Sequence, residues 1–101
     1  MEWYNYIFGF LAGAFWANFV PHFVHGISGN SFPTPFARLG IKEVSSPVVN
    51  VLWGLFNLIA GYLLFRIAKI SEDDYLSLVT FFAGFAFLGI SNSLIFTKRG
   101  K

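Results

Sequence analysis

The sequence contains no cysteine and very little charge. The absence of cysteine excludes disulfide bonds, thiolate metal sites and a thiol nucleophile. Charged residues make up only 12% of the 101 residues, whereas hydrophobic residues make up 55% and aromatic residues 21%. A water-soluble domain of this length needs far more charge to cover its surface. The composition therefore predicts one small domain, residues 1–101, whose solvent is lipid over much of its surface.

Sequence signatures of common enzyme chemistry are missing as well. The chain has no glycine-rich phosphate loop, no H-E-x-x-H and no G-x-S-x-G. The acids Glu72, Asp73 and Asp74 are consecutive, and helix capping explains them better than catalysis does. The seven basic residues are dispersed between apolar segments, so nucleic acid is not an expected partner. We therefore expect no enzyme activity, no catalytic residue, no metal site and no bound cofactor.

Three long apolar segments dominate the chain, and we expect helices over residues 3–25, 47–69 and 72–97. At about 1.5 Å of rise per residue, each segment can cross a hydrocarbon core about 30 Å thick. Only helices satisfy their own backbone hydrogen bonds in lipid over such a length. The sequence therefore predicts an all-α membrane protein with three transmembrane helices.

Two helix starts carry capping signals. Ser46 before Pro47 is typical of an N-cap followed by proline at the first helical position. In the stretch "SEDD", Ser71 precedes Asp74 by three residues, which predicts a serine cap for the third helix.

The connection over residues 26–46 is too long for a passive link. Its stretch "TPFARLG" combines a capping threonine, a proline and a terminal glycine, which predicts a short interfacial helix. We expect this helix to cover one end of the bundle as a lid, with its basic residues at the lipid headgroups.

Lysine and arginine are distributed unevenly between the two ends of the predicted bundle. Arg66 and Lys69 lie at one end, and the other five basic residues lie at the opposite end: Arg38, Lys42, Lys98, Arg99 and Lys101. The positive-inside rule then predicts a multi-pass cell-membrane protein with the N-terminus outside and the C-terminus cytoplasmic.

Polar side chains gather near the predicted cytoplasmic ends of the three helices. On the first helix, Asn18, His22 and His25 are spaced i, i+4, i+7 and form one stripe. Pro21 lies within that stripe and should kink or break the helix. Asn50 and Asn57 share one face of the second helix. We call the whole set the polar layer and predict that it binds a ligand: Trp16, Asn18, His22, His25, Asn50, Trp53, Asn57, Ser91 and Asn92.

Two interpretations of the polar layer stay open. Asparagine and serine often hydrogen-bond across transmembrane helices, contributing about 1 kcal/mol each, so the layer can simply hold the helices together. An intramembrane histidine instead indicates a functional site, because imidazole relays protons or binds metal. His22 and His25 alone do not complete a zinc site, and a haem or metal would need a second subunit.

The spacing PHF-x2-G-x2-G-x2-FPTPFA begins at Pro21 and is followed by "SSP" at 45–47, Asn50, "WG" at 53–54 and Asn57. This pattern resembles one found in small uncharacterised bacterial integral membrane proteins. The resemblance covers about the middle third of the chain. It implies a location in a bacterial inner membrane and no mechanism, and it assigns no functional residue.

These features favour a homo-oligomer that holds a polar cavity for an ion or small molecule and conducts or transports it. The small-residue row on the first helix (Gly9, Gly13 and Ala17) is expected to mediate self-association. The alternative is a non-catalytic accessory or regulatory subunit that docks onto a larger membrane protein. A haem-binding protein or membrane enzyme using His22 is the less favoured third class.

Overall fold

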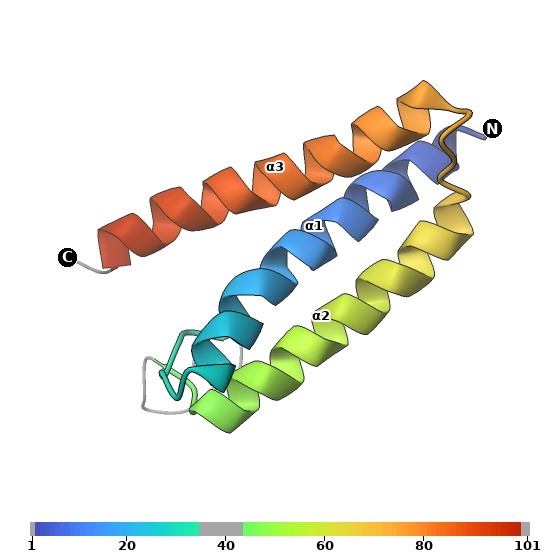
Figure 1. The fold of residues 1–101 in the computed structure, drawn as a ribbon. Coiled ribbons are helices and arrows are strands. Elements are labelled where there is room, and N and C mark those ends of the chain that lie inside the picture. The colour runs from blue at the N-terminus through green and yellow to red at the C-terminus, as the bar shows by residue number, and fades with distance from the viewer. Residues whose placement is uncertain (1, 35–43, 100–101) are drawn as a thin grey trace.

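The computed structural model describes residues 2–34 and 44–99, and these residues form three long helices (Figure 1). The helices are α1 (Trp3–Ile27), α2 (Pro47–Ala68) and α3 (Tyr75–Arg99). By length and composition, Trp3–Ile27, Pro47–Ala68 and Tyr75–Thr97 can each cross a membrane. The predicted all-α fold with three helices able to span a membrane is therefore confirmed. The predicted interfacial helix falls largely on residues 35–43, which lie outside the described residues.

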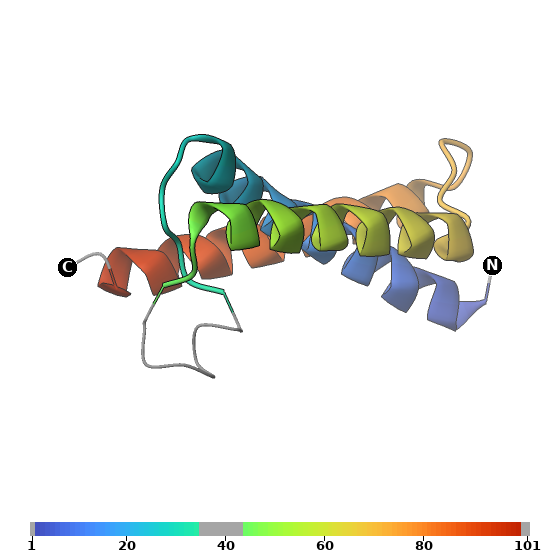
Figure 2. The same cartoon turned by 90° about the horizontal axis from the view of Figure 1, so that it is seen from below.

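Helix α1 is the central element of the fold. It packs along both α2 and α3, whereas α2 and α3 scarcely contact each other. In Figure 1, α2 and α3 spread apart toward the end at which the chain connects α1 to α2. We call this end, which also carries the end of α3, the loop end. The opposite end carries the start of α1 and the turn at 69–74, and we call it the N-terminal end. Figure 2 shows the described residues after α1, up to residue 34, running across the loop end, and Phe32 forms a β-bridge with Ser45 just before α2.

Glycine allows the backbones of α1 and α3 to touch where they cross. A Cβ atom added at Gly13 would collide with the Phe81 carbonyl oxygen and would lie 2.8 Å from the Phe85 nitrogen. A Cβ atom added at Gly84 would collide with the Phe10 carbonyl oxygen. Because backbone atoms cannot move aside as side chains do, only glycine fits at this crossing.

The predicted self-association through Gly9, Gly13 and Ala17 is wrong for that row. All three residues are buried within one subunit, and Gly9 faces side chains of Thr80 and Ala68. The row packs against other helices of the same subunit. It leaves no free surface on which a second copy could pack.

The observed start of α2 agrees with the predicted one, whereas the start of α3 differs from it. The Ser46 hydroxyl accepts a hydrogen bond from the Val49 amide at 3.3 Å, which confirms the predicted cap. Helix α3 begins at Tyr75 and not at residue 72. Its cap is Asp74, whose carboxylate accepts from the Leu76 amide at 3.2 Å. The Ser71 hydroxyl is used inside the turn, where it accepts from the Asp73 amide at 3.1 Å.

Pro21 does not end α1, which continues as a helix to Ile27. The predicted break is therefore absent. The α1 backbone beside Pro21 packs on Gly54 of α2, where a Cβ atom would lie 3.1 Å from the Phe23 nitrogen and 3.4 Å from the Phe19 carbonyl oxygen. This contact brings the polar stripes of α1 and α2 together.

Candidate functional site

Three asparagines connect the three helices in one chain of hydrogen bonds. Asn18 on α1 donates from Nδ2 to Asn57 Oδ1 on α2 at 3.1 Å, and Asn92 on α3 donates to Asn18 Oδ1 at 3.3 Å. Asn57 in turn donates to the Trp53 carbonyl oxygen at 2.7 Å. Asn18 therefore links α2 and α3 by hydrogen bonds, whereas nearer the N-terminal end the two helices meet through the Phe65 and Phe81 rings, whose centroids are 5.3 Å apart.

A second polar group lies closer to the loop end and is centred on Asn50. His22 Nδ1 lies 2.8 Å from Asn50 Oδ1, and the two residues are only 3% and 0% exposed. The Asn50 amide nitrogen lies 2.9 Å from the carbonyl oxygen of Phe32 and 3.1 Å from that of Ser45. Because this nitrogen donates to backbone, Asn50 Oδ1 is the acceptor, so His22 Nδ1 carries the proton. In the neutral imidazole, Nε2 is then left as a hydrogen-bond acceptor.

Asn50 therefore fixes the base of the connection between α1 and α2. Phe32 and Ser45 form an isolated antiparallel β-bridge, with N–H to oxygen distances of 3.2 and 2.9 Å. The hydroxyls of Thr34 and Ser45 are also hydrogen-bonded to each other. Asn50, itself bonded to His22, thus holds the backbone at Phe32 and at Ser45 in place.

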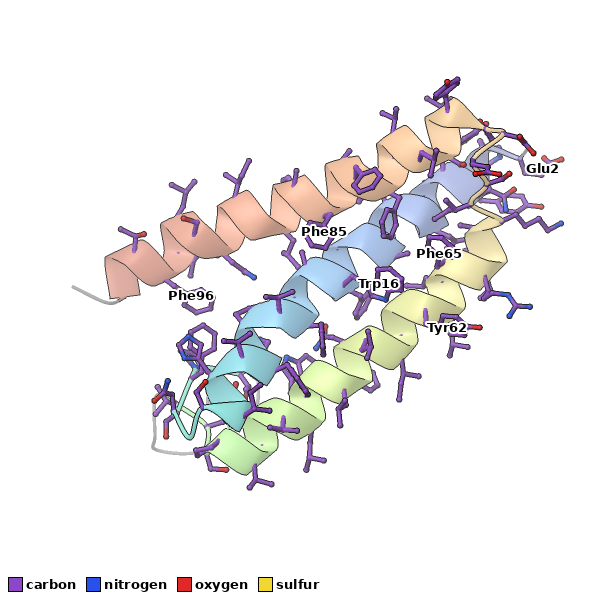
Figure 3. The ribbon with its side chains drawn as sticks, in the orientation of Figure 1. Glu2, Trp16, Tyr62, Phe65, Phe85 and Phe96 are labelled. Carbon is purple, nitrogen blue, oxygen red and sulfur yellow. The ribbon has the colours of Figure 1, made fainter. Side chains whose placement is uncertain are left out.

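Trp16, Trp53 and Ser91 lie outside the two side-chain groups described above, although the Trp53 carbonyl oxygen accepts from Asn57. The Trp16 indole donates to the Leu58 carbonyl at 3.2 Å, and its ring stacks on that of Phe65 with the centroids 5.6 Å apart. Figure 3 shows the two side chains near each other between α1 and α2. The Trp53 ring stacks on Phe56 at 5.2 Å. Ser91 on α3 is half-buried. The structure therefore divides the predicted layer into an asparagine chain, a His22–Asn50 pair, the Trp53 indole next to His22, and a Trp16 indole that packs on aromatic side chains instead.

His25 lies at the loop end of the same stripe as His22. Its ring stacks on the Phe32 ring with the ring centroids 4.2 Å apart. Its Nδ1 atom is buried and has no hydrogen-bond partner within residues 2–34 and 44–99. His25 and His22 therefore share contact with Phe32, whose ring centroid lies 5.3 Å from that of His22.

Two buried polar residues at the N-terminal end were missed by the sequence reasoning. Asn5 is 7% exposed and donates to the Ile67 carbonyl at the end of α2 at 3.2 Å. Ser77 is 2% exposed, and its hydroxyl accepts from the Ser71 amide at 3.2 Å. The signal for Asn5 was its position four residues before Gly9 on the same face of α1. Both residues join chain segments and do not extend the polar layer.

Asn92 is one of the members of the polar layer that are partly open to the surface of the described structure. Asn50 and Asn57 are buried and bonded through both oxygen and nitrogen. Asn92 is half-buried, and its one side-chain bond to the described residues uses Nδ2, so Oδ1 accepts none from them. Asn92 also lies seven residues, or about 10 Å along the axis, before the end of α3. Asn92 therefore lies inside Tyr75–Thr97, the part of α3 that can cross a membrane by its length and composition.

Comparison with protein-family models, curated proteins and solved structures gives no significant match to this chain. The function must therefore be argued from the site itself.

Proposed function

We propose that this small integral membrane protein binds an ion or small polar molecule in the polar layer and conducts or transports it as a homo-oligomer. The observation that carries the proposal is Asn92 Oδ1, which accepts no hydrogen bond from the described residues at membrane depth. An unsatisfied amide group in hydrocarbon costs several kcal/mol. Water or a polar ligand at this atom removes that cost, and lipid chains do not.

Asn18 and His22 can provide the next polar contacts for a species bound at Asn92. Asn18 is half-buried and bridges Asn92 to Asn57 on α2. It is therefore the next polar side chain after Asn92. His22 lies one turn closer to the loop end on the same face of α1. With Nδ1 bonded to Asn50, the remaining nitrogen of His22 can accept a proton or contact a cation. This row of amides and one imidazole suits a small polar species better than a large apolar one.

Water access to Asn92 tests the proposal directly, because the chain has no cysteine of its own. Asn92→Cys in liposomes should react with a water-soluble methanethiosulfonate at least roughly tenfold faster than a lipid-facing cysteine, since the reactive thiolate forms only where water solvates it. Ile90→Cys is the matched control, because Ile90 is 63% exposed and lies two residues away at nearly the same depth. Equal, slow reaction at both positions would contradict a polar, wet layer.

We propose the loop end as the cytoplasmic end in a bacterial inner membrane, which the basic-residue asymmetry and the family resemblance support. Ser31 and Asp73 are both exposed; Ser31 follows α1 at the loop end, and Asp73 lies in the turn at the N-terminal end. In intact cells, an impermeant thiol reagent should label Asp73→Cys and leave Ser31→Cys unlabelled. Labelling of Ser31→Cys alone would reverse the orientation.

Self-association cannot use the buried small-residue row of α1, and we propose a small-residue face of α3 as the contact between copies. Ala86, Gly89 and Ser93 are exposed, and a Cβ atom added at Gly89 would meet nothing within 4 Å. Small residues on a transmembrane helix permit close approach of a second helix. Gly89→Leu should shift the detergent-solubilised protein to lower mass while the helical content stays the same. An unchanged oligomer would rule out this face as the contact between copies.

The second candidate function is that of an accessory subunit, and the same face of α3 favours it. A transmembrane helix of a larger protein could pack on Gly89 and supply a polar group to the layer. In that case the purified protein is monomeric, and Gly89→Leu abolishes recovery of the larger protein with it. A stable homo-oligomer in the absence of other chains favours the first function.

A further inference from the structure

We propose that Phe32 is an aromatic plug that closes the polar layer at the loop end; this inference rests on the proposed function. Phe32 belongs to the connection between α1 and α2, yet its ring lies among side chains of α1 and α3. The ring centroid is 4.2 Å from that of His25 and 4.6 Å from that of Phe96. Figure 3 shows Phe96 projecting from α3 toward the loop end of α1.

The contacts of Phe32 place it over the asparagine chain. Phe96 follows Asn92 by four residues, so the two side chains lie on one face of α3, with Phe96 one turn closer to the loop end. His22 follows Asn18 by four residues and has the same relation to it on α1. A ring that contacts both His22 and Phe96 therefore covers the Asn18–Asn92 pair from the loop end.

The backbone of Phe32 is held by a different helix from those that hold its ring. Asn50 on α2 donates to the Phe32 carbonyl at 2.9 Å, and His22 on α1 lies 2.8 Å from the same asparagine. A change in what His22 contacts through Nε2 can therefore be transmitted through Asn50 to the position of the plug. Phe32, Asn50 and His22 are thus connected to one another by direct contacts.

The reaction rate of Asn92→Cys with the methanethiosulfonate measures whether Phe32 restricts access. In liposomes, Phe32→Ala should raise that rate by roughly tenfold, because the stacking contacts that keep the ring over the layer are lost. Phe32→Leu keeps an apolar side chain but loses the stacking, so its rate should be intermediate. Phe87→Ala is the matched control, because Phe87 is 59% exposed and its ring contacts Phe10, away from the plug.

The plug and the proposed function fail in different ways. If Asn92→Cys reacts faster than Ile90→Cys and Phe32→Ala leaves its rate unchanged, the plug is wrong and the wet polar layer stands. If Asn92→Cys and Ile90→Cys react equally slowly with and without the Phe32 ring, the polar layer is wrong, and with it the plug. A slow rate at Ile90→Cys in the Phe32→Ala background shows that the helices remain inserted.

Discussion

Replacing Gly13 by alanine is expected to lower the free energy of unfolding by about 3 kcal/mol, the upper part of the usual range for overpacking. The added Cβ atom would collide with the Phe81 carbonyl oxygen and crowd the Phe85 nitrogen. These are backbone atoms of a regular helix, so α3 as a whole must move away from α1. Reversible unfolding in mixed micelles measures the difference.

Gly89→Ala is the matched control for this substitution. Within one subunit, a Cβ atom added at Gly89 meets nothing within 4 Å. Because Gly89 lies on the face proposed for contact between copies, both variants are compared at a dilution at which each micelle holds one chain. The same chemical change there should stabilise the helix by about 0.5 to 1 kcal/mol, because alanine loses less backbone freedom on folding than glycine does. If Gly13→Ala is as mild as Gly89→Ala, the close crossing of α1 and α3 does not exist.

The second large effect is expected at Asn50, where leucine should lower the free energy of unfolding by about 2 kcal/mol. The substitution leaves the His22 Nδ1–H group buried without its acceptor and removes the amide donor that holds the Phe32 carbonyl. Adding His22→Leu removes the stranded donor as well. The double variant should therefore lose less stability than the sum of the single variants, by about 1 to 2 kcal/mol.

The same double-mutant comparison with Asn57→Leu in place of Asn50→Leu serves as the control. Asn57 bonds to Asn18 and to the Trp53 carbonyl and not to His22, so their effects should add within about 0.5 kcal/mol. Additive effects for Asn50 and His22 would show that their hydrogen bond contributes nothing to the folded state.

Much of the fold could be predicted because each helix carries its own local signals. Apolar length gave the three spans, and Ser46 with Pro47 marked the start of α2. At α3, Ser71 and Asp74 are both good capping residues, and their spacing alone does not decide between them. The choice of Asp74 depends on the turn, in which the Ser71 backbone amide and hydroxyl are already bonded.

The polar layer was predicted as a set, and its internal pairing was not. The i, i+4 and i, i+7 spacings place Asn18 with His22, and Asn50 with Asn57, on common faces. Which face of which helix meets Asn92 depends on α1 lying between α2 and α3, and no periodicity encodes that order. The same order explains the error at Gly13. Small residues occur on both α1 and α3, and only the central position of α1 shows that its row is buried.

A structure of the protein in a lipid nanodisc, at a resolution that shows ordered water, tests the central claim most directly. The proposed binding of a polar species at Asn92 predicts density for water or a small ligand about 3 Å from Asn92 Oδ1, within hydrogen-bond distance. That density should continue toward Asn18 beneath the Phe32 ring. A lipid acyl chain packed against Asn92, with Oδ1 turned to a donor of the protein itself, would contradict the claim and leave the layer as a contact between helices.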